Sequence, residues 1–158
     1  MTVFAIDPGN VESGWCLIEK ETFKPLAFAK EVNEKVLLRC ASMPFDLACV
    51  EMIASYGMAV GKEVFETCKW IGRFEEKIKQ ATDRYPTLIY RRDEKLHICG
   101  DIRAKDSNIR QALIDRFATH DFKNGKGTKK DPDFFYGFKS DIWQSFSVAV
   151  TFVETCLK

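Results

Sequence analysis

A short apolar stretch near the start of the chain, from Val3 to Ile6, runs directly into Asp7, Pro8 and Gly9. Four apolar residues with β-branched and aromatic side chains predict a buried strand. The strand should end here, because proline lacks a ladder N–H and glycine permits a sharp turn. Its last residue is then a carboxylate in apolar surroundings, which is costly unless a cation, a metal or hydrogen-bond donors compensate. The simpler alternative is that Asp7 caps the Pro-Gly turn with its own side chain.

A second carboxylate stands in the same kind of position further along the chain. Residues 45–53 contain the continuous apolar run 47–50, which is typical of a central strand covered on both faces. Glu51 follows this run directly. A lone glutamate at a strand end usually points to solvent, but two acids that end two buried strands favour a shared role.

The rest of the pattern predicts alternating strands and helices. Three strands are expected within residues 3–7, 13–18 and 23–32, joined by short connections as in an antiparallel meander. Further strands are predicted at 45–53 and 87–90, and helices at 33–41, 62–81, about 105–117 and 141–157. The expected N-caps are Asn33, Asp106 or Ser107, and Ser140. A meander followed by alternating helices and strands indicates an α/β fold with a mixed central sheet flanked by helices.

The length of 158 residues, with 46% hydrophobic and 30% charged residues, is that of an ordinary globular protein. We therefore expect a single domain over residues 1–158 with one substantial core. The chain has no run of about 18 apolar residues, so no membrane span is predicted. The first residues lack the basic flank and cleavage site of a signal peptide, which predicts a cytoplasmic protein.

The six cysteines contain no C-x-x-C pair, so neither a zinc site nor a disulfide framework is expected. We interpret them as reduced, mostly buried thiols. The net charge of +1 neither favours nor excludes a nucleic-acid partner, so the local distribution of charge has to decide.

A third carboxylate, Asp141, stands at the start of the last predicted helix. Helix N-termini attract aspartate without any function, because the helix dipole favours negative charge there. In a mixed sheet, however, the strands that end at Asp7 and Glu51 can be neighbours, and a terminal helix can pack across their ends. Hard divalent cations such as Mg²⁺ or Mn²⁺ prefer oxygen ligands and would relieve the repulsion among three carboxylates. Two such ions about 4 Å apart activate a water and stabilise the leaving oxygen of a phosphodiester.

Taken together, these segments resemble the RuvC family of Holliday-junction resolvases. The likeness is carried by Ile6-Asp7-Pro8-Gly9, Ser13-Gly14-Trp15, Val50-Glu51, and Ser140-Asp141 at the head of a helix with alanine and valine. Within the family, residues 60–67 and 70–74 resemble the bacteriophage branch, and the likeness covers nearly the whole chain. It implies an RNase H-like fold, a homodimer, and Mg²⁺-dependent nicking of two opposed strands at a four-way junction.

The resemblance also implies roles for individual residues. Asp7, Glu51 and Asp141 match three of the family's metal-binding acids, for one or two Mg²⁺ ions per subunit with Mn²⁺ as a substitute. The family typically places a fourth acid one helical turn later, where this chain has Gln144. We keep Gln144 as a candidate metal-binding and catalytic residue, because an amide can coordinate through its carbonyl oxygen. It supplies no charge, so either this branch tolerates the change or the chain is a catalytically weakened form, natural or engineered.

Basic residues mark a candidate DNA-binding surface. The loop 123–130 has four lysines, two glycines and no acid, and it would either follow DNA phosphates or remain solvated. Arg91 and Arg92 would extend a basic face. Lys105, at a predicted helix start, is placed like a family lysine that contacts DNA. The basic candidates are Lys105, Lys123, Lys126, Lys129, Lys130, Arg91 and Arg92.

The loop that follows Glu51 contains two further candidates, Tyr56 and Met58. Either would wedge between bases at the crossover of a junction, as an aromatic residue in that loop does in some relatives. The alternative is a plain exposed loop residue.

Three functions remain open from the sequence. The first is a structure-selective endonuclease that binds four-way and other branched DNA and nicks opposed strands. The second is a branched-DNA binding protein with weak or no cleavage, which Gln144 keeps open. The third is an RNase H-like nuclease that acts on RNA–DNA hybrids.

Overall fold

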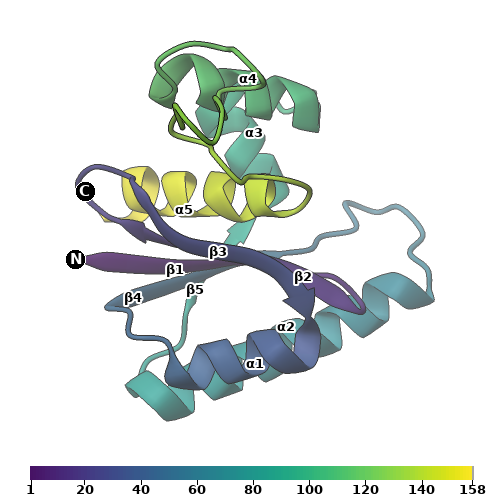
Figure 1. Cartoon of the computed structure of the whole chain (residues 1–158). Helices are drawn as coiled ribbons and strands as arrows, with labels where there is room; N and C mark the ends of the chain where they lie inside the picture. The colour runs from purple at the N-terminus through teal and green to yellow at the C-terminus, as the bar shows by residue number, and fades with distance from the viewer. Residues whose placement is uncertain (158) are drawn as a thin grey trace.

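A mixed five-stranded sheet with the order β3-β2-β1-β4-β5 forms the centre of the computed structural model, which describes residues 1–157 (Figure 1). β1 is antiparallel to β2, β2 is antiparallel to β3, and β4 runs parallel to both β1 and β5. The strands are β1 (Thr2–Asp7), β2 (Glu12–Glu19), β3 (Pro25–Val32), β4 (Leu47–Met52) and β5 (Thr87–Tyr90). The predicted meander and mixed sheet are therefore confirmed.

Helices cover both faces of this sheet. α1 and α2 pack on one face, α5 lies across the other, and α3 and α4 lie beyond α5 (Figure 1). The helices are α1 (Asn33–Ser42), α2 (Lys62–Thr82), α3 (Arg91–Cys99), α4 (Asp106–Phe117) and α5 (Ile142–Cys156). No helix within residues 1–157 has the length and apolar character needed to cross a bilayer.

Side chains on β1 alternate between two separate cores. Phe4 and Ile6 belong to the core under α1 and α2, whereas Val3 and Ala5 belong to the core under α5. Successive side chains of a strand point to opposite faces, so Asp7 continues the row that faces α5.

α5 is buried around almost its whole circumference. Its residues Ile142, Trp143 and Phe146 pack in the core that also contains Phe135 and Phe138, and this aromatic layer covers the side of the helix away from the sheet. A helix that is covered on all sides has to be apolar all round, as the sequence of α5 largely is.

α3 was missed in the sequence, from which no helix was predicted between residues 90 and 105. The helix begins at Arg91 and ends before Gly100, whose positive φ of 71° closes it. Its apolar residues Leu96, Ile98 and Cys99 are confined to the last turns, so the first turn carries no hydrophobic periodicity. Tertiary contacts of the charged first turn, described below, hold it in place.

The expected N-caps were wrong by one or two residues. Val32, Lys105 and Asp141 occupy the N-cap positions of α1, α4 and α5. The Asn33 side chain is buried instead, where its Nδ2 donates to the backbone oxygen of Gly9 at 2.9 Å. It thus ties the start of α1 to the turn after β1.

Candidate functional site

Asp7 and Glu51 meet at one edge of the sheet. β1 and β4 are parallel neighbours with Ile6 opposite Val50, so the next residue of each strand lies side by side. Both face α5, because Glu51 follows Cys49 of the core under α5 with period two. Their carboxyl groups therefore lie next to each other at the ends of β1 and β4.

The electrostatics of this pair are unfavourable without a cation. Burial, followed by the nearby Glu51 carboxylate, raises the pKa of Asp7 well above its usual value, and Asp141 and Glu94 add to the effect. The alternative role for Asp7, as a cap of the Pro-Gly turn, is filled by Ser13, whose Oγ accepts the Gly9 N–H at 3.1 Å.

Gly14 brings Asp141 to the same edge. Gly14 pairs with Asp7 across β1 and β2, and a Cβ on it would lie 2.5 Å from the backbone oxygen of Asp141. Only a residue without a side chain therefore lets the start of α5 settle over the end of β1. Lys30 of β3 holds the Asp141 carboxylate, with 2.9 Å between Nζ and Oδ2, and this hydrogen bond raises the pKa of Lys30.

Glu94 is a fourth carboxylate that the sequence analysis missed. It lies in α3, is fully buried, and accepts a hydrogen bond of 2.7 Å from Ser147 Oγ in α5. Burial and then the charge of Glu51 raise the pKa of Glu94 well above its usual value. Ser147 was the available signal, because a hydroxyl inside a buried apolar helix requires a hydrogen-bond partner.

Gln144 faces the same cluster of acids, but its amide oxygen already accepts a hydrogen bond from a guanidinium. Arg91, the first residue of α3, donates from Nη1 to Gln144 Oε1. The same guanidinium lies 3.3 Å from Glu94 Oε1 and 4.0 Å from Glu51 Oε1, and it pairs with Asp106 at the start of α4. The structure thus places Arg91, predicted to contact DNA, among the acids.

The donor set suits a hard divalent ion. Asp7, Glu51 and Asp141 supply carboxylate oxygens at one sheet edge, and Glu94 Oε2 is buried with no hydrogen-bond partner in the described chain. As these side chains lie, no three His, Cys, Asp or Glu within residues 1–157 converge as metal ligands would. One of these carboxylates, that of Asp141, is instead paired with Lys30.

The loop between β4 and α2 presents its two candidates to solvent. The side chains of Tyr56 and Met58 are 59% and 76% exposed. Tyr56 also borders a hollow of about 340 Å³ between this loop and α3, lined by Tyr56, Arg91, Arg92, Lys95 and Ile102. Tyr56, predicted to wedge between bases, therefore lines the same hollow as Arg91 and Arg92, predicted to contact DNA.

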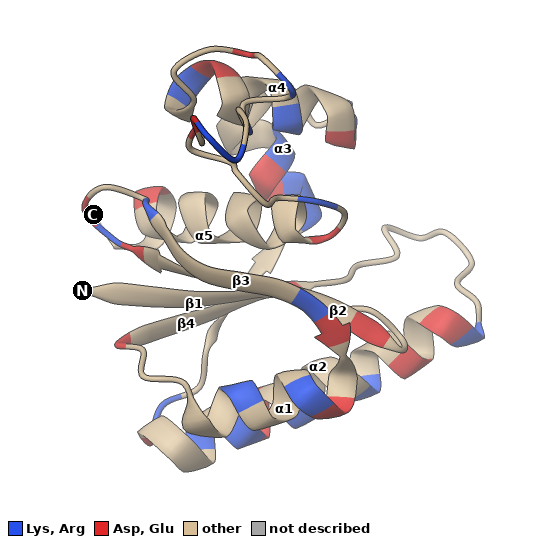
Figure 2. Cartoon of the chain, in the orientation of Figure 1, with Lys and Arg blue, Asp and Glu red and all other residues tan. Residues whose placement is uncertain are grey.

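The lysine-rich loop lies on the side of the sheet that carries α5. Lys123, Lys129 and Lys130 are exposed, while Lys126 is half-buried. Lys105 is also exposed, at the N-cap of α4. Basic residues occur in α3, α4 and the connection into α5, but acidic residues lie among them there, as they do on α1 and α2 (Figure 2).

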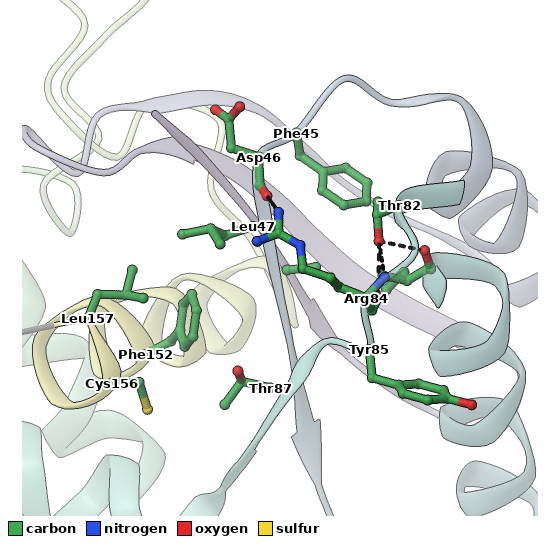
Figure 3. Close-up of a pocket in the computed structure, with 12 residues that line it drawn as sticks. Phe45, Asp46, Leu47, Thr82, Arg84, Tyr85, Thr87, Phe152, Cys156 and Leu157 are labelled. Atoms are coloured by element: carbon green, nitrogen blue, oxygen red, sulfur yellow. Dashed lines mark hydrogen bonds between the residues drawn. The ribbon is translucent and has the colours of Figure 1, made fainter. Parts of the chain in front are cut away.

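A cavity of about 230 Å³ lies away from the acids, between the ends of α2 and α5 where β4 and β5 begin (Figure 3). Arg84 crosses it and donates to the backbone oxygen of Asp46 at 2.9 Å. Apolar groups such as Phe152 and Leu157 line its other side. Its charged groups are engaged in structural hydrogen bonds, so the candidate site is the cluster at the opposite end of the strands.

The raised pKa of Asp7 generates a stability prediction. The folded state binds this proton more tightly than the unfolded state, so stability should fall as pH rises from about 4, the unfolded value, through the folded value. In metal-free buffer at pH 7.5, Asp7→Asn should therefore stabilise the fold by about 1 kcal/mol or more, roughly 2–4 °C in Tm.

Thermal melts between pH 4.5 and 8 would measure this effect, with the exposed Asp121→Asn as the control. Mg²⁺ should raise the Tm of the wild type more than that of Asp7→Asn. A less stable Asp7→Asn protein at pH 7.5 would contradict the interpretation.

Two solved structures share this architecture. The structure of Thermus thermophilus RuvC matches with a TM-score of 0.67 and 14% identity over 96% of this chain and 92% of that chain. T. thermophilus RuvC in complex with a Holliday junction substrate matches with a TM-score of 0.66 and 13% identity, covering 96% and 91%. No family model and no curated protein sequence matches. The chain therefore has an RNase H-like α/β fold of the RuvC type.

Proposed function

We propose that this chain is a divalent-metal-dependent endonuclease of branched DNA, from the bacteriophage branch of the RuvC family. The observation that carries the proposal is the meeting of Asp7, Glu51 and Asp141 at one edge of a RuvC-type sheet. A structural neighbour bound to a Holliday junction substrate supports a four-way junction as the preferred DNA. The proposal treats residues 1–158 as a single nuclease domain, acting in the cytoplasm of a bacterial host.

The acids would hold Mg²⁺, with Mn²⁺ as a substitute. Bound there, such an ion activates water and stabilises the leaving oxygen of a phosphodiester. The protein's part is to hold Asp7 and Glu51 side by side and to release Asp141 from Lys30. Without a cation, the carboxylates would repel the phosphate of the substrate.

Residues around the acids would bind the junction. The exposed lysines of the loop 123–130, Lys105 and Arg92 can contact phosphates, and each contact adds salt-sensitive affinity. Tyr56 or Met58, in the loop that follows β4, can insert between bases at the branch point.

A second candidate function is branched-DNA binding with weak or no cleavage. Gln144 favours it, since its amide oxygen supplies no charge and already accepts a hydrogen bond from Arg91. A nuclease of RNA–DNA hybrids is the third candidate, and the same assay separates all three.

The activity prediction compares a labelled four-way junction, a three-way junction and an RNA–DNA hybrid, each with Mg²⁺ and with Mn²⁺. The wild type should nick the four-way junction fastest. Asp7→Asn and Glu51→Gln should each slow nicking by about 100-fold or more, roughly 2.7 kcal/mol of barrier. Both should bind the junction at least as tightly as the wild type, because repulsion of phosphate falls.

Asp121→Asn is the matched control and should cut at the wild-type rate. Binding without nicking by the wild type would identify a binding protein, and preferential cutting of the hybrid would identify a hybrid nuclease. Undiminished nicking by both Asp7→Asn and Glu51→Gln would refute the assignment of the site.

The lysine-rich loop generates a prediction about salt. Replacing Lys126, Lys129 and Lys130 with Ala should weaken binding to every branched DNA. The log-log salt slope should flatten by up to about three units, roughly 0.9 for each phosphate that the loop no longer neutralises. Fluorescence anisotropy between low and moderate salt would measure the slope. The control replaces Lys20, Lys35 and Lys77, which lie outside the loop, and an unchanged slope in the loop variant would show that the loop contacts only solvent.

Two opposed cuts require two active sites, so we propose a homodimer that uses α2. Phe65 on this helix is 60% exposed, although Phe74 and Ile78 further along the same helix are buried in the core. An exposed aromatic side chain on a long helix is typical of an interface. Sedimentation at micromolar concentration without DNA should show a dimer, and Phe65→Lys should shift it to a monomer. Phe122→Lys, at a similarly exposed loop position, is the control, and a monomeric wild type would contradict the proposal.

A further inference from the structure

Arg91 is a positive charge placed inside the cluster of acids. Its guanidinium contacts groups from four elements: Glu51 of β4, Glu94 of α3, Gln144 of α5 and Asp106 of α4. Its side chain is only 23% exposed. A planar guanidinium has five donors in a rigid fork, so this many oxygen partners can hold it in one orientation.

Gln144 completes the surroundings of this guanidinium. A carboxylate at this position would supply negative charge to a second divalent ion. The amide supplies none, and its oxygen already accepts a hydrogen bond from Arg91. The cation beside residue 144 is therefore already part of the protein.

Glu94 pairs with the guanidinium of Arg91. Its carboxylate is fully buried, and Ser147 Oγ donates to the same oxygen, Oε1, that lies 3.3 Å from Arg91. A buried carboxylate is stable only when it is paired and hydrogen-bonded. Glu94 and Arg91 therefore depend on each other.

We propose that Arg91 is the second cation of this site, so that each subunit binds one divalent ion, held by Asp7, Glu51 and Asp141. Glu94 is the positioning residue that fixes Arg91 beside that ion. This inference rests on the proposed function, in which the phosphate of a DNA backbone approaches the same edge of the sheet. The guanidinium N–H groups then donate to a non-bridging phosphate oxygen, which is a favoured pairing for arginine.

The test counts bound Mn²⁺ per subunit by calorimetry and by electron paramagnetic resonance, without DNA. The wild type should bind one ion, and Gln144→Asp alone should also bind one, because the new carboxylate pairs with Arg91. The double variant Arg91→Ala/Gln144→Asp should bind two. Two ions in the wild type, or one in a folded double variant, would overturn the proposal.

Glu94→Gln tests the positioning role separately, because it keeps the shape of the side chain and removes its charge. It should still bind one Mn²⁺ and bind the junction within about twofold of the wild type, yet nick at least about tenfold more slowly, which is roughly 1.4 kcal/mol of barrier. Nicking by Glu94→Gln at the wild-type rate would overturn this role. Arg91→Lys should recover part of the rate that Arg91→Ala removes.

Arg116→Ala is the matched control. Arg116 pairs with Glu154, ten residues beyond Gln144 on α5 and therefore about 15 Å away along the helix. It should leave the count of one ion unchanged. Thermal melts establish that each variant folds, and if the double variant does not, the count for the wild type still decides.

The ion count tests the role of Arg91, and the nuclease assay tests the proposed function, so each claim can be refuted separately. One bound ion in a protein that nicks no substrate would refute the proposed function and leave the ion count standing. Two bound ions in an active nuclease would refute the role of Arg91 and leave the function standing. A wild type that binds no Mn²⁺ without DNA would refute the ion assignment, and the nicking assay would still decide the function.

Discussion

Repulsion among buried carboxylates is the constraint on which the rest of this site depends. Asp7, Glu51 and Glu94 lie close enough that burial and mutual charge raise the pKa of both Asp7 and Glu94. Arg91 lies against two of these acids, and Lys30 holds the fourth, Asp141. The fold thus carries its own cations beside these carboxylates.

The backbone makes this arrangement possible by two simple means. The period of two along β1 and β4 turns Asp7 and Glu51 to the same face. Gly14 leaves room for Asp141, since any side chain there would clash with the backbone at the start of α5. The acids therefore meet because of strand register and one missing side chain, and the charged groups then have to be neutralised where they lie.

Local sequence determined the meander, the mixed sheet and the two acids that end buried strands, because each depends on periodicity or on a Pro-Gly turn within a few residues. It also indicated Asp141 as a site residue, and Gln144 as the position where the RuvC family typically has an acid. The sequence even contained indirect evidence for Glu94, since Ser147 is a polar residue in an apolar helix and requires a hydrogen-bond partner. The Ser147 hydroxyl indicated that a hydrogen-bond partner existed. Which residue it is, Glu94, 53 residues away, depends on how α3 packs.

Tertiary structure alone decided which charges meet. Arg91 reads as a basic surface residue in the chain, yet the docking of α3 against α5 turns it toward Glu94 and Gln144. The first turn of α3 has no apolar stripe, so no pattern in the sequence predicts a helix there. Long-range ion pairs and hydrogen bonds are specific to one packing arrangement, whereas hydrophobic periodicity is a property of the local chain. Asp7, Glu51 and Asp141 could therefore be predicted from the sequence, whereas Glu94 and the cations that balance these acids could not.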